Sequence, residues 1–183
     1  MTQGIFLMAF GHRAYAFCAA NLSKSIKYFS DVSITYCVEP GLKKHLRKED
    51  YDYFDKVIEL KTPQDACLAK VSIYDYLQYD QNLYLDVDAV CLQDVKPLLK
   101  DLADTKKFYC TDVRGVGGKD DNIHYSIWAE NADVWEAFKL DDFATLPGIQ
   151  SSFCFIRKNQ KSKRFFEKVK ANYVNGEIGR AHV

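Results

Sequence analysis

An apolar strand, a helix and a second apolar strand follow one another in the first forty residues, and this succession restricts the fold more than any other feature of the chain. Residues 4–10 form an apolar run that Gly11 ends, which predicts a buried strand. Apolar residues recur at helical spacing over 15–29, and an extended run follows at 32–38. Such units form parallel strands with a right-handed crossover, so we expect an α/β fold with a mostly parallel central sheet.

The alternation of strands and helices continues along the chain. Further strands are expected at 57–60, 83–85, 107–111 and 149–156, and further helices at 42–54, 63–79, 94–103, 132–140 and 162–173. The segment 114–122 holds three glycines and is expected to be a loop. Since no repeat or linker divides the chain, we expect one domain over 1–176, with ligands at the carboxyl ends of its strands.

Composition limits the classes of partner. The 183 residues hold 25 Lys and Arg against 25 Asp and Glu, without a basic block, so nucleic acid is not expected as a partner. No apolar run reaches the length of a membrane span, and His12 and Arg13 interrupt the first one before it could act as a signal peptide. The six cysteines form no Cys-x-x-Cys pair, which favours reduced thiols and a cytoplasmic protein.

Residues 84–88 read Tyr-Leu-Asp-Val-Asp and end the apolar run at 83–85. Side chains two residues apart in a strand point to the same side, so the carboxylates of Asp86 and Asp88 are expected to face one point. Two hard oxygen ligands, with room for water and phosphate, suit Mg²⁺ or Mn²⁺. Aspartates are equally common in the turn after a strand or before a helix, and the pair alone does not separate the two interpretations.

Together with other segments, these residues resemble the nucleotide-sugar glycosyltransferases of the GT-A fold, particularly family eight, the glycogenin and lipopolysaccharide galactosyltransferase group. Residues 84–90 are similar to the family's Tyr-Leu-Asp-x-Asp-x-(Val/Ile) signature, and a short helix is expected just after them at 95–99. Tyr15 precedes a Ser-Ile pair by the family's spacing, and Lys70 lies on the helix before the aspartate strand. Gln150 and Ser151 stand where the family has Asn-(Ser/Ala), which leaves the donor sugar open.

The resemblance implies a Rossmann-like GT-A domain that transfers a sugar from a nucleotide donor, expected to be a UDP-sugar, with retention of configuration. The acceptor, whether carbohydrate, lipid-linked or protein, stays open. The cofactor implied is Mn²⁺ or Mg²⁺, held by Asp86 and Asp88, because a divalent ion neutralises the leaving diphosphate. The donor-binding residues implied are Tyr15 on the base, Lys70 near a phosphate or the sugar, Asp86 on the ribose, and Gln150 and Ser151 on sugar hydroxyls.

Each of these residues also has a plainer interpretation. Tyr15 could equally be a core aromatic at the start of a helix. Lys70 could lie on a solvated helix face, and Gln150 and Ser151 could form an ordinary strand entrance. Asp112 is a weaker polar candidate for the same pocket. The glycines of 115–118 lack the Lys-Ser/Thr of a phosphate-binding loop and indicate a flexible loop on the acceptor side.

Two other functions stay open. A phosphatase of the haloacid-dehalogenase type also has Asp-x-Asp after an apolar strand, but there the motif normally ends the first strand, and a downstream Lys and acidic pair cannot be placed. A non-catalytic nucleotide-sugar-binding module is the third candidate. Turnover of a UDP-sugar would exclude the module, and hydrolysis of a phosphomonoester would favour the phosphatase.

The end of the chain carries a separate expectation. Family-eight domains continue with a segment that holds a metal-binding His, and nothing in this sequence matches it. Residues 177–183 resemble the translation of a widely used sequencing adapter, so we expect a non-native tail there and do not assign His182 to the metal. On this hypothesis the chain binds its donor weakly and transfers little sugar.

Overall fold

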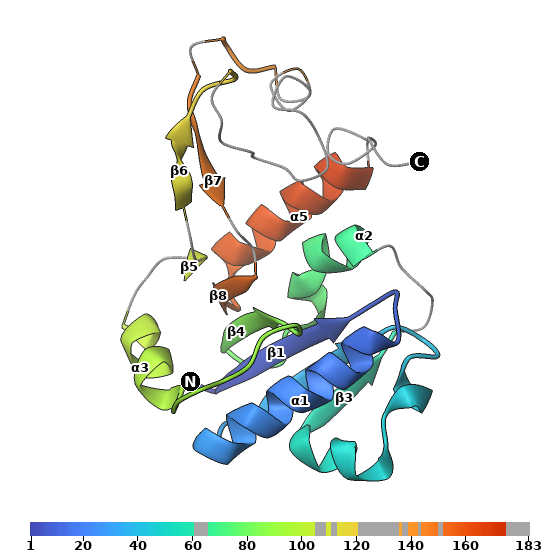
Figure 1. The fold of residues 1–183 in the computed structure, drawn as a ribbon. Coiled ribbons are helices and arrows are strands. Elements are labelled where there is room, and N and C mark those ends of the chain that lie inside the picture. Colours follow the sequence, from blue (N-terminus) through green and yellow to red (C-terminus); the bar gives the residue numbers. More distant parts are fainter. Residues whose placement is uncertain are drawn as a thin grey trace.

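The computed structural model describes residues 1–60, 66–104, 109–110, 113–120, 136, 139–142, 144–149 and 152–174. Within them, six strands form one sheet in the order β3-β2-β1-β4-β8-β5, and two more form a separate ribbon (Figure 1). The strands of the sheet are β1 (Gln3–Ala9), β2 (Ile34–Val38), β3 (Lys56–Glu59), β4 (Gln81–Asp86), β5 (Tyr109–Cys110) and β8 (Phe153–Arg157). The ribbon consists of β6 (Val113–Gly117) and β7 (Leu146–Ile149).

The sheet is mostly parallel, as predicted. β1 lies in its middle and pairs in parallel with β2 on one side and β4 on the other, while β2 pairs in parallel with β3. β8 alone runs against its neighbours, because it is antiparallel to both β4 and β5. The carboxyl ends of β1, β2, β3 and β4 therefore meet at one edge of the sheet.

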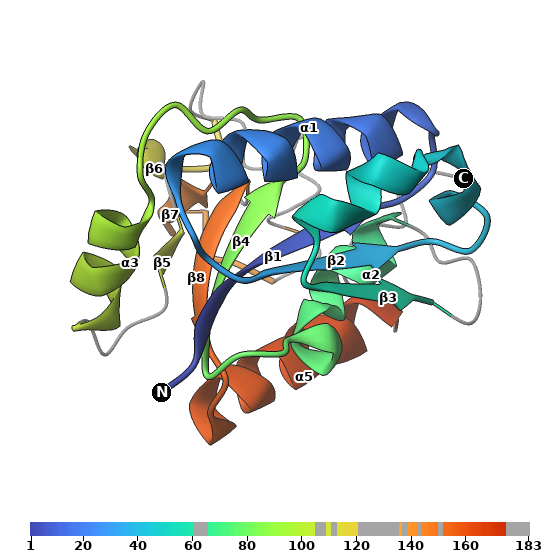
Figure 2. The ribbon, with the colours of Figure 1, turned by 90° about the horizontal axis from the view of Figure 1, so that it is seen from below.

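Helices cover both faces of the sheet (Figure 2). They are α1 (Ala14–Phe29), η1 (Lys43–His45), η2 (Lys48–Tyr53), α2 (Ala66–Val71), η3 (Ile73–Tyr76), α3 (Lys96–Ala103) and α5 (Gln160–Val174). One core cluster joins α1 and α3 to side chains such as Ile5 and Leu83. The other joins α2, η3 and α5 to Phe6 and Tyr84. Alternate residues of each central strand thus enter opposite cores.

Gly4 in β1 is required by a close approach. A Cβ built on Gly4 would lie 2.2 Å from a ring carbon of Tyr79, and that ring is held by a 3.1 Å hydrogen bond from the Thr35 hydroxyl to the Tyr79 hydroxyl. An added methyl group would have to displace the Tyr79 ring that packs against β1. Glycine at this position is therefore a packing requirement.

The predicted helix at 42–54 is wrong, because two short 3₁₀ helices, η1 and η2, replace it. Arg47 has an extended backbone between them. Its N–H donates to Asp50 Oδ2 at 2.9 Å, and its guanidinium donates to Asp50 Oδ1 at 2.9 Å. Asp50 thus caps a new turn, and the break lets Leu46 and Phe54 enter the core.

The helix predicted at 63–79 is shorter than expected in the described residues. α2 ends at Val71, η3 follows, and Leu77 is extended. The Asn82 side chain fixes the turn before β4, since its Nδ2 donates to the Tyr79 carbonyl at 2.7 Å and its Oδ1 accepts from the Tyr79 N–H at 3.2 Å. An Asn side chain that satisfies the backbone in this way competes with a continuing helix.

Two further predictions need correction. The expected loop at 114–122 begins as strand β6, which pairs with β7 through an irregular register. The single strand expected at 149–156 is divided, because β7 ends at Ile149 in the ribbon and β8 begins at Phe153 in the main sheet. An apolar run shows that a segment is extended but not which sheet it joins. The helix predicted at 132–140 lies mostly outside the described residues.

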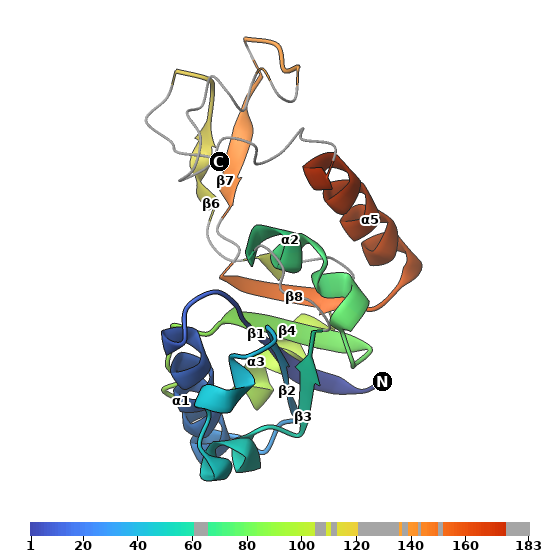
Figure 3. The same ribbon diagram turned by 90° about the vertical axis from the view of Figure 1, so that its right-hand side faces the viewer.

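Figure 3 shows α5 and α2 together beyond β8, on the side of the sheet opposite α1. α5 confirms the helix predicted at 162–173 and α3 the one at 94–103, with small shifts in their bounds. None of the described helices combines the length and apolar character that crossing a membrane requires.

Candidate functional site

The candidate site lies at the edge where the parallel strands end. Asp86 is the last residue of β4, and Met8 of β1 is its register partner. The Asp86 N–H donates to the carbonyl of Ser152 at 2.8 Å, which fixes the end of β4 against the start of β8. The carboxylate thus stands on a backbone that is hydrogen-bonded on both sides, in a position where ligands of open α/β sheets bind.

Asp86 shares its carboxylate with two neighbours. Lys70 on α2 places its Nζ 2.8 Å from Asp86 Oδ1 and 3.1 Å from Oδ2. The Tyr84 hydroxyl also donates to Asp86 Oδ1. Lys70 Nζ lies 5.9 Å from the centre of the Tyr84 ring, within the range of a cation–π contact. Lys70, Tyr84 and Asp86 therefore form one cluster, which we call the Asp86 cluster.

Tyr84 belongs to this cluster because of strand geometry. It precedes Asp86 by two residues, so both side chains point to the face that α2 covers. Tyr84 is only 3% exposed. Burial raises the pKa of its phenol well above the usual range, and the negative charges of Asp86 and Asp88 raise it further. The hydroxyl therefore stays protonated and acts as a permanent donor to Asp86.

Asp88 lies in the turn after β4 and is exposed. Its carboxylate makes no ion pair or hydrogen bond within the part of the chain that the structure describes. Its negative charge adds to the causes that raise the pKa of the Tyr84 phenol, after burial and the charge and hydrogen bond of Asp86. Of the two aspartates, Asp88 is the one whose oxygens have no partner in the described part of the chain and are available to a ligand.

The pair fits a divalent ion of the kind that is completed by water and phosphate. No group of three or more His, Cys, Asp or Glu side chains suited to a metal occurs among the described residues. Mg²⁺ is commonly held by one or two carboxylates together with substrate phosphates, and this donor set offers those carboxylates in Asp88 and Asp86. A site formed by the protein alone, such as a structural zinc site, does not fit these residues.

Of the other predicted site residues, only Tyr15 lies in the part of the chain that the structure describes. Tyr15 lies in the first turn of α1, just after β1, and 43% of its surface is exposed, so it is not a core aromatic. Gln150, Ser151 and Asp112 lie outside the described residues. Their neighbour Ser152 is described, and its carbonyl contacts the Asp86 backbone as stated above.

Sequence reasoning assigned no role to Tyr84 or to Glu39. The signal for Tyr84 was present, because a residue two before Asp86 in a strand shares its face. Glu39 follows β2 at the same edge of the sheet, and its Oε2 accepts a 2.6 Å hydrogen bond from the N–H of Gly11. The pairing of Glu39 with Gly11 depends on β1 and β2 being neighbours, which is a property of the folded sheet.

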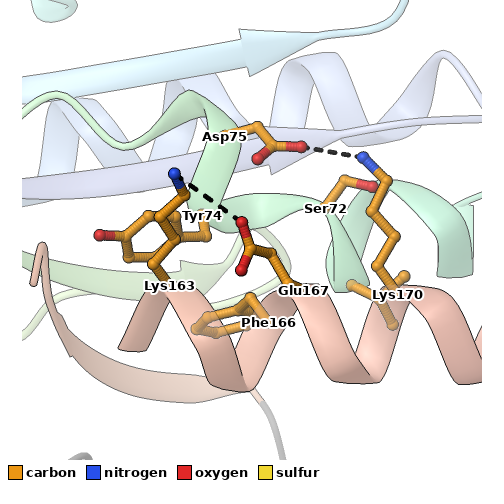
Figure 4. Close-up of a pocket in the computed structure, with 8 residues that line it drawn as sticks. Ser72, Tyr74, Asp75, Lys163, Phe166, Glu167 and Lys170 are labelled. Atoms are coloured by element: carbon orange, nitrogen blue, oxygen red, sulfur yellow. Dashed lines mark hydrogen bonds and ion pairs between the residues drawn. The ribbon is translucent and has the colours of Figure 1, made fainter. Parts of the chain in front are cut away.

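A separate pocket of about 230 Å³ opens between η3 and α5 (Figure 4). Its charged residues pair with one another, Asp75 with Lys170 at 2.9 Å and Lys163 with Glu167 at 3.8 Å. None of the predicted site residues lines it. Because its charges are already paired within the protein, we do not assign the donor to it.

Comparison with known proteins reveals the fold. A structure of the galactosyltransferase LgtC, in complex with donor and acceptor sugar analogs, matches over 94% of this chain with 17% identity and a TM-score of 0.52. The glycosyltransferase GlyE of Streptococcus pneumoniae TIGR4 matches over 96% of the chain with 13% identity and a TM-score of 0.56. The chain has the GT-A glycosyltransferase fold. This confirms the predicted fold class.

The GT-A domain described here is shorter than the proteins it matches. The chain spans 64% of LgtC and 40% of GlyE. No family model and no curated protein matches the sequence. The similarity to these structures therefore establishes the fold. Any inference about the substrate and the reaction depends on the residues of the site.

Proposed function

We propose that this GT-A domain binds the diphosphate of a nucleotide-sugar donor at the carboxyl edge of its sheet and serves a glycosyltransferase that moves the sugar to an acceptor with retention of configuration. The observation that carries the proposal is the pairing of Asp86 with Lys70 and Tyr84 at the end of β4, with the exposed Asp88 two residues further along. This is the edge where open α/β sheets bind ligands. Solved structures with the same fold include the glycosyltransferases LgtC and GlyE.

In this proposal the two aspartates have different tasks. Asp88, exposed and without a partner in the described structure, would be the principal ligand of Mn²⁺ or Mg²⁺. Asp86 would share the ion while Tyr84 and Lys70 fix its orientation. The ion would neutralise the diphosphate as it leaves. Lys70, whose side chain is 44% exposed, would offer a second positive charge to a phosphate or the sugar.

Three other residues complete the proposed donor site. Tyr15, exposed beside the end of β1, would stack on the base through its ring face. Gln150 and Ser151 would bind hydroxyl groups of the sugar, as the sequence resemblance implies. We propose that the donor is a UDP-sugar and that the protein acts in the cytoplasm.

Calorimetry with UDP, in the presence and absence of Mn²⁺, tests the proposal. We expect Mn²⁺ to strengthen UDP binding at least tenfold, and Asp88→Asn to abolish this dependence while leaving the melting temperature unchanged. Asp52→Asn is the matched control, because Asp52 is an exposed aspartate on η2, away from the edge. Equal binding with and without Mn²⁺ in the unmodified protein would refute the metal-dependent site.

A nucleotide-sugar-binding module without turnover is a second candidate, because the described residues at this edge are all assigned to binding. Release of UDP from a UDP-sugar in the presence of Mn²⁺ would exclude it. No observation favours the phosphatase. Both oxygens of Asp86 are engaged by Lys70, and Tyr84 holds one of them as well, which is a poor arrangement for a nucleophile.

A further inference from the structure

Helix α5 concentrates positive charge in a chain that is neutral overall. The 183 residues hold 25 Lys and Arg against 25 Asp and Glu. In α5, Glu167 is the single acidic residue. The basic residues of the helix are Lys161, Lys163, Arg164, Lys168 and Lys170. The helix therefore carries a local excess of positive charge, and its two faces balance that charge differently.

One face of α5 pairs its charges and the other does not. On the inner face, which lines the pocket beside η3 (Figure 4), both lysines pair with acidic side chains of the protein, Glu167 and Asp75. On the outer face, Lys161, Arg164 and Lys168 follow one another at spacings of three and four residues, so they lie on one side of the helix. All three are exposed, and none of their side chains makes an ion pair or a hydrogen bond within the residues that the structure describes. We call these three residues the α5 stripe.

The apolar side chain of Phe165 lies within the α5 stripe. Phe165 comes four residues after Lys161 and three before Lys168, and 52% of its surface is exposed. Its ring lies edge-on to Phe166 at 5.2 Å, and Phe166 packs against the core on the inner face. Lys and Arg side chains have apolar stems that lie along hydrophobic surface while their charges stay in water. The outer face of α5 thus offers an exposed aromatic ring flanked by cations.

We propose that the α5 stripe and Phe165 dock this domain reversibly on a lipid bilayer that contains anionic headgroups. This inference goes beyond the proposed function and does not depend on the donor site. Charge complementarity supports it, because three unpaired cations would face a layer of negative headgroups while the ring enters the boundary between headgroups and acyl chains. The stripe from Lys161 to Lys168 is about 10 Å long and stands on the convex surface of a helix, which a flat layer can reach.

Nucleic acid is the other polyanion that a basic stripe could meet. A single strand is usually bound in a positively charged groove that follows its backbone, with its bases stacked on aromatic rings. The pocket beside α5 lies on the inner face, and the α5 stripe lies on the opposite one. Three cations would also neutralise only a few phosphates. The observations therefore favour the bilayer, and nucleic-acid binding is an outcome that the test must distinguish.

Sedimentation with vesicles tests the proposal on the unmodified protein. The vesicles consist of phosphatidylcholine alone, or of phosphatidylcholine with about 30% phosphatidylglycerol, whose headgroup is anionic. Each Lys or Arg near such a surface strengthens binding about fivefold. Three of them predict roughly 100-fold tighter binding to the anionic vesicles than to the neutral ones. Raising NaCl from about 0.1 M to about 0.5 M should remove most of this difference, since salt screens the attraction.

Two variants separate the charges from the apolar ring. Lys161→Gln combined with Arg164→Gln and Lys168→Gln should remove the preference for anionic vesicles. Phe165→Ser should weaken binding several-fold at both salt concentrations, because it removes apolar area and leaves the charge unchanged. Both variants should keep the Mn²⁺-dependent binding of UDP, since neither alters the Asp86 cluster.

Matched controls remove the same charge, or an exposed apolar side chain, elsewhere on the molecule. The charge control combines Lys44→Gln on η1, Lys48→Gln on η2 and Lys100→Gln on α3, three exposed lysines whose side chains have no partner in the described part of the chain. Leu92→Ser is the apolar control, because Leu92 is 80% exposed and follows β4. Both controls should keep the preference for anionic vesicles.

Three results would overturn the inference. They are equal binding of the unmodified protein to the two kinds of vesicle, equal losses in the α5 variant and its charge control, and binding of a single-stranded oligonucleotide through the α5 stripe without binding to anionic vesicles. Unchanged binding of Phe165→Ser would overturn the part assigned to the ring. The first comparison uses the unmodified protein, so it decides the question even if a variant does not fold. Failure of UDP to bind with Mn²⁺ would refute the proposed function and leave this inference standing.

Discussion

Replacing Tyr84 by Phe tests whether the Asp86 cluster is held as the structure indicates. The substitution keeps the buried ring and removes only the hydroxyl that donates to Asp86 Oδ1. A hydrogen bond to a charged group contributes about 1.5–3 kcal/mol. Asp86 keeps Lys70 at 2.8 Å and is 25% exposed, so water can replace part of the lost bond. We therefore expect the lower end, about 1.5 kcal/mol, in the free energy of unfolding.

That loss corresponds to a fall in melting temperature of roughly 3–6 °C for a chain of this size. Urea unfolding with linear extrapolation measures the free energy directly. Because burial raises the pKa of Tyr84 in the folded state, the contribution of its hydroxyl is fully present below the phenol's unfolded pKa of about 10. It is lost only as the pH rises through the folded pKa. The difference between Tyr84→Phe and the unmodified protein should therefore be constant from about pH 6 to 9.

Tyr74→Phe is the matched control. The Tyr74 hydroxyl donates to the Asn159 carbonyl at 2.9 Å, a neutral acceptor in the pocket region away from the aspartates. We expect a smaller loss, about 0.5–1 kcal/mol, and unchanged Mn²⁺-dependent UDP binding, whereas Tyr84→Phe should weaken that binding because Asp86 is less well oriented. Equal stability losses with unchanged binding in both variants would refute the role of Tyr84.

Two further predictions concern the scaffold. Gly4→Ala should destabilise the fold by about 1–3 kcal/mol, since the new Cβ would lie 2.2 Å from the Tyr79 ring and core overpacking costs this much; urea unfolding measures it, and an unchanged midpoint would contradict the packing. The pKa of Asp50 is lowered in the folded state, mainly by its side-chain hydrogen bond with Arg47. The ionised carboxylate therefore contributes to the free energy of unfolding above the unfolded pKa of about 4, and this contribution is lost as the pH falls through the lower folded pKa. Asp50→Asn should make unfolding less dependent on acid in that range, which thermal unfolding between pH 2 and 6 would show.

The long elements could be predicted from the sequence because their apolar periodicity agrees with their burial. β1, α1, β2, β4 and α5 lie where the pattern placed them. The errors occur where a side chain bonds to a nearby backbone group, as Asp50 does with Arg47 and Asn82 with Tyr79. Such local bonds compete with helix continuation, and periodicity does not register them.

The site was predictable in part for a related reason. Asp86 and Asp88 are two residues apart, which predicts that their carboxylates face one point if the chain is extended through both, but β4 ends at Asp86 and Asp88 lies in the turn after it. The contacts of Asp86 with Lys70 and of Glu39 with Gly11 join segments separated by 16 and 28 residues. These contacts arise only when β1, β2 and β4 lie side by side and α2 covers the face of the sheet.

The charges at this edge give a reason why the diphosphate would need a metal ion. Asp86 and Asp88 bring two negative charges close to the Tyr84 hydroxyl, and Lys70 balances only one of them. An anionic diphosphate approaching this edge would meet a net negative site and be repelled. A divalent ion reverses the sign, because it leaves a net positive charge that attracts the diphosphate. The contacts of Asp86 with Lys70 and Tyr84 would also keep its carboxylate in place before the proposed ion and nucleotide bind, so less orientational freedom would be lost on binding.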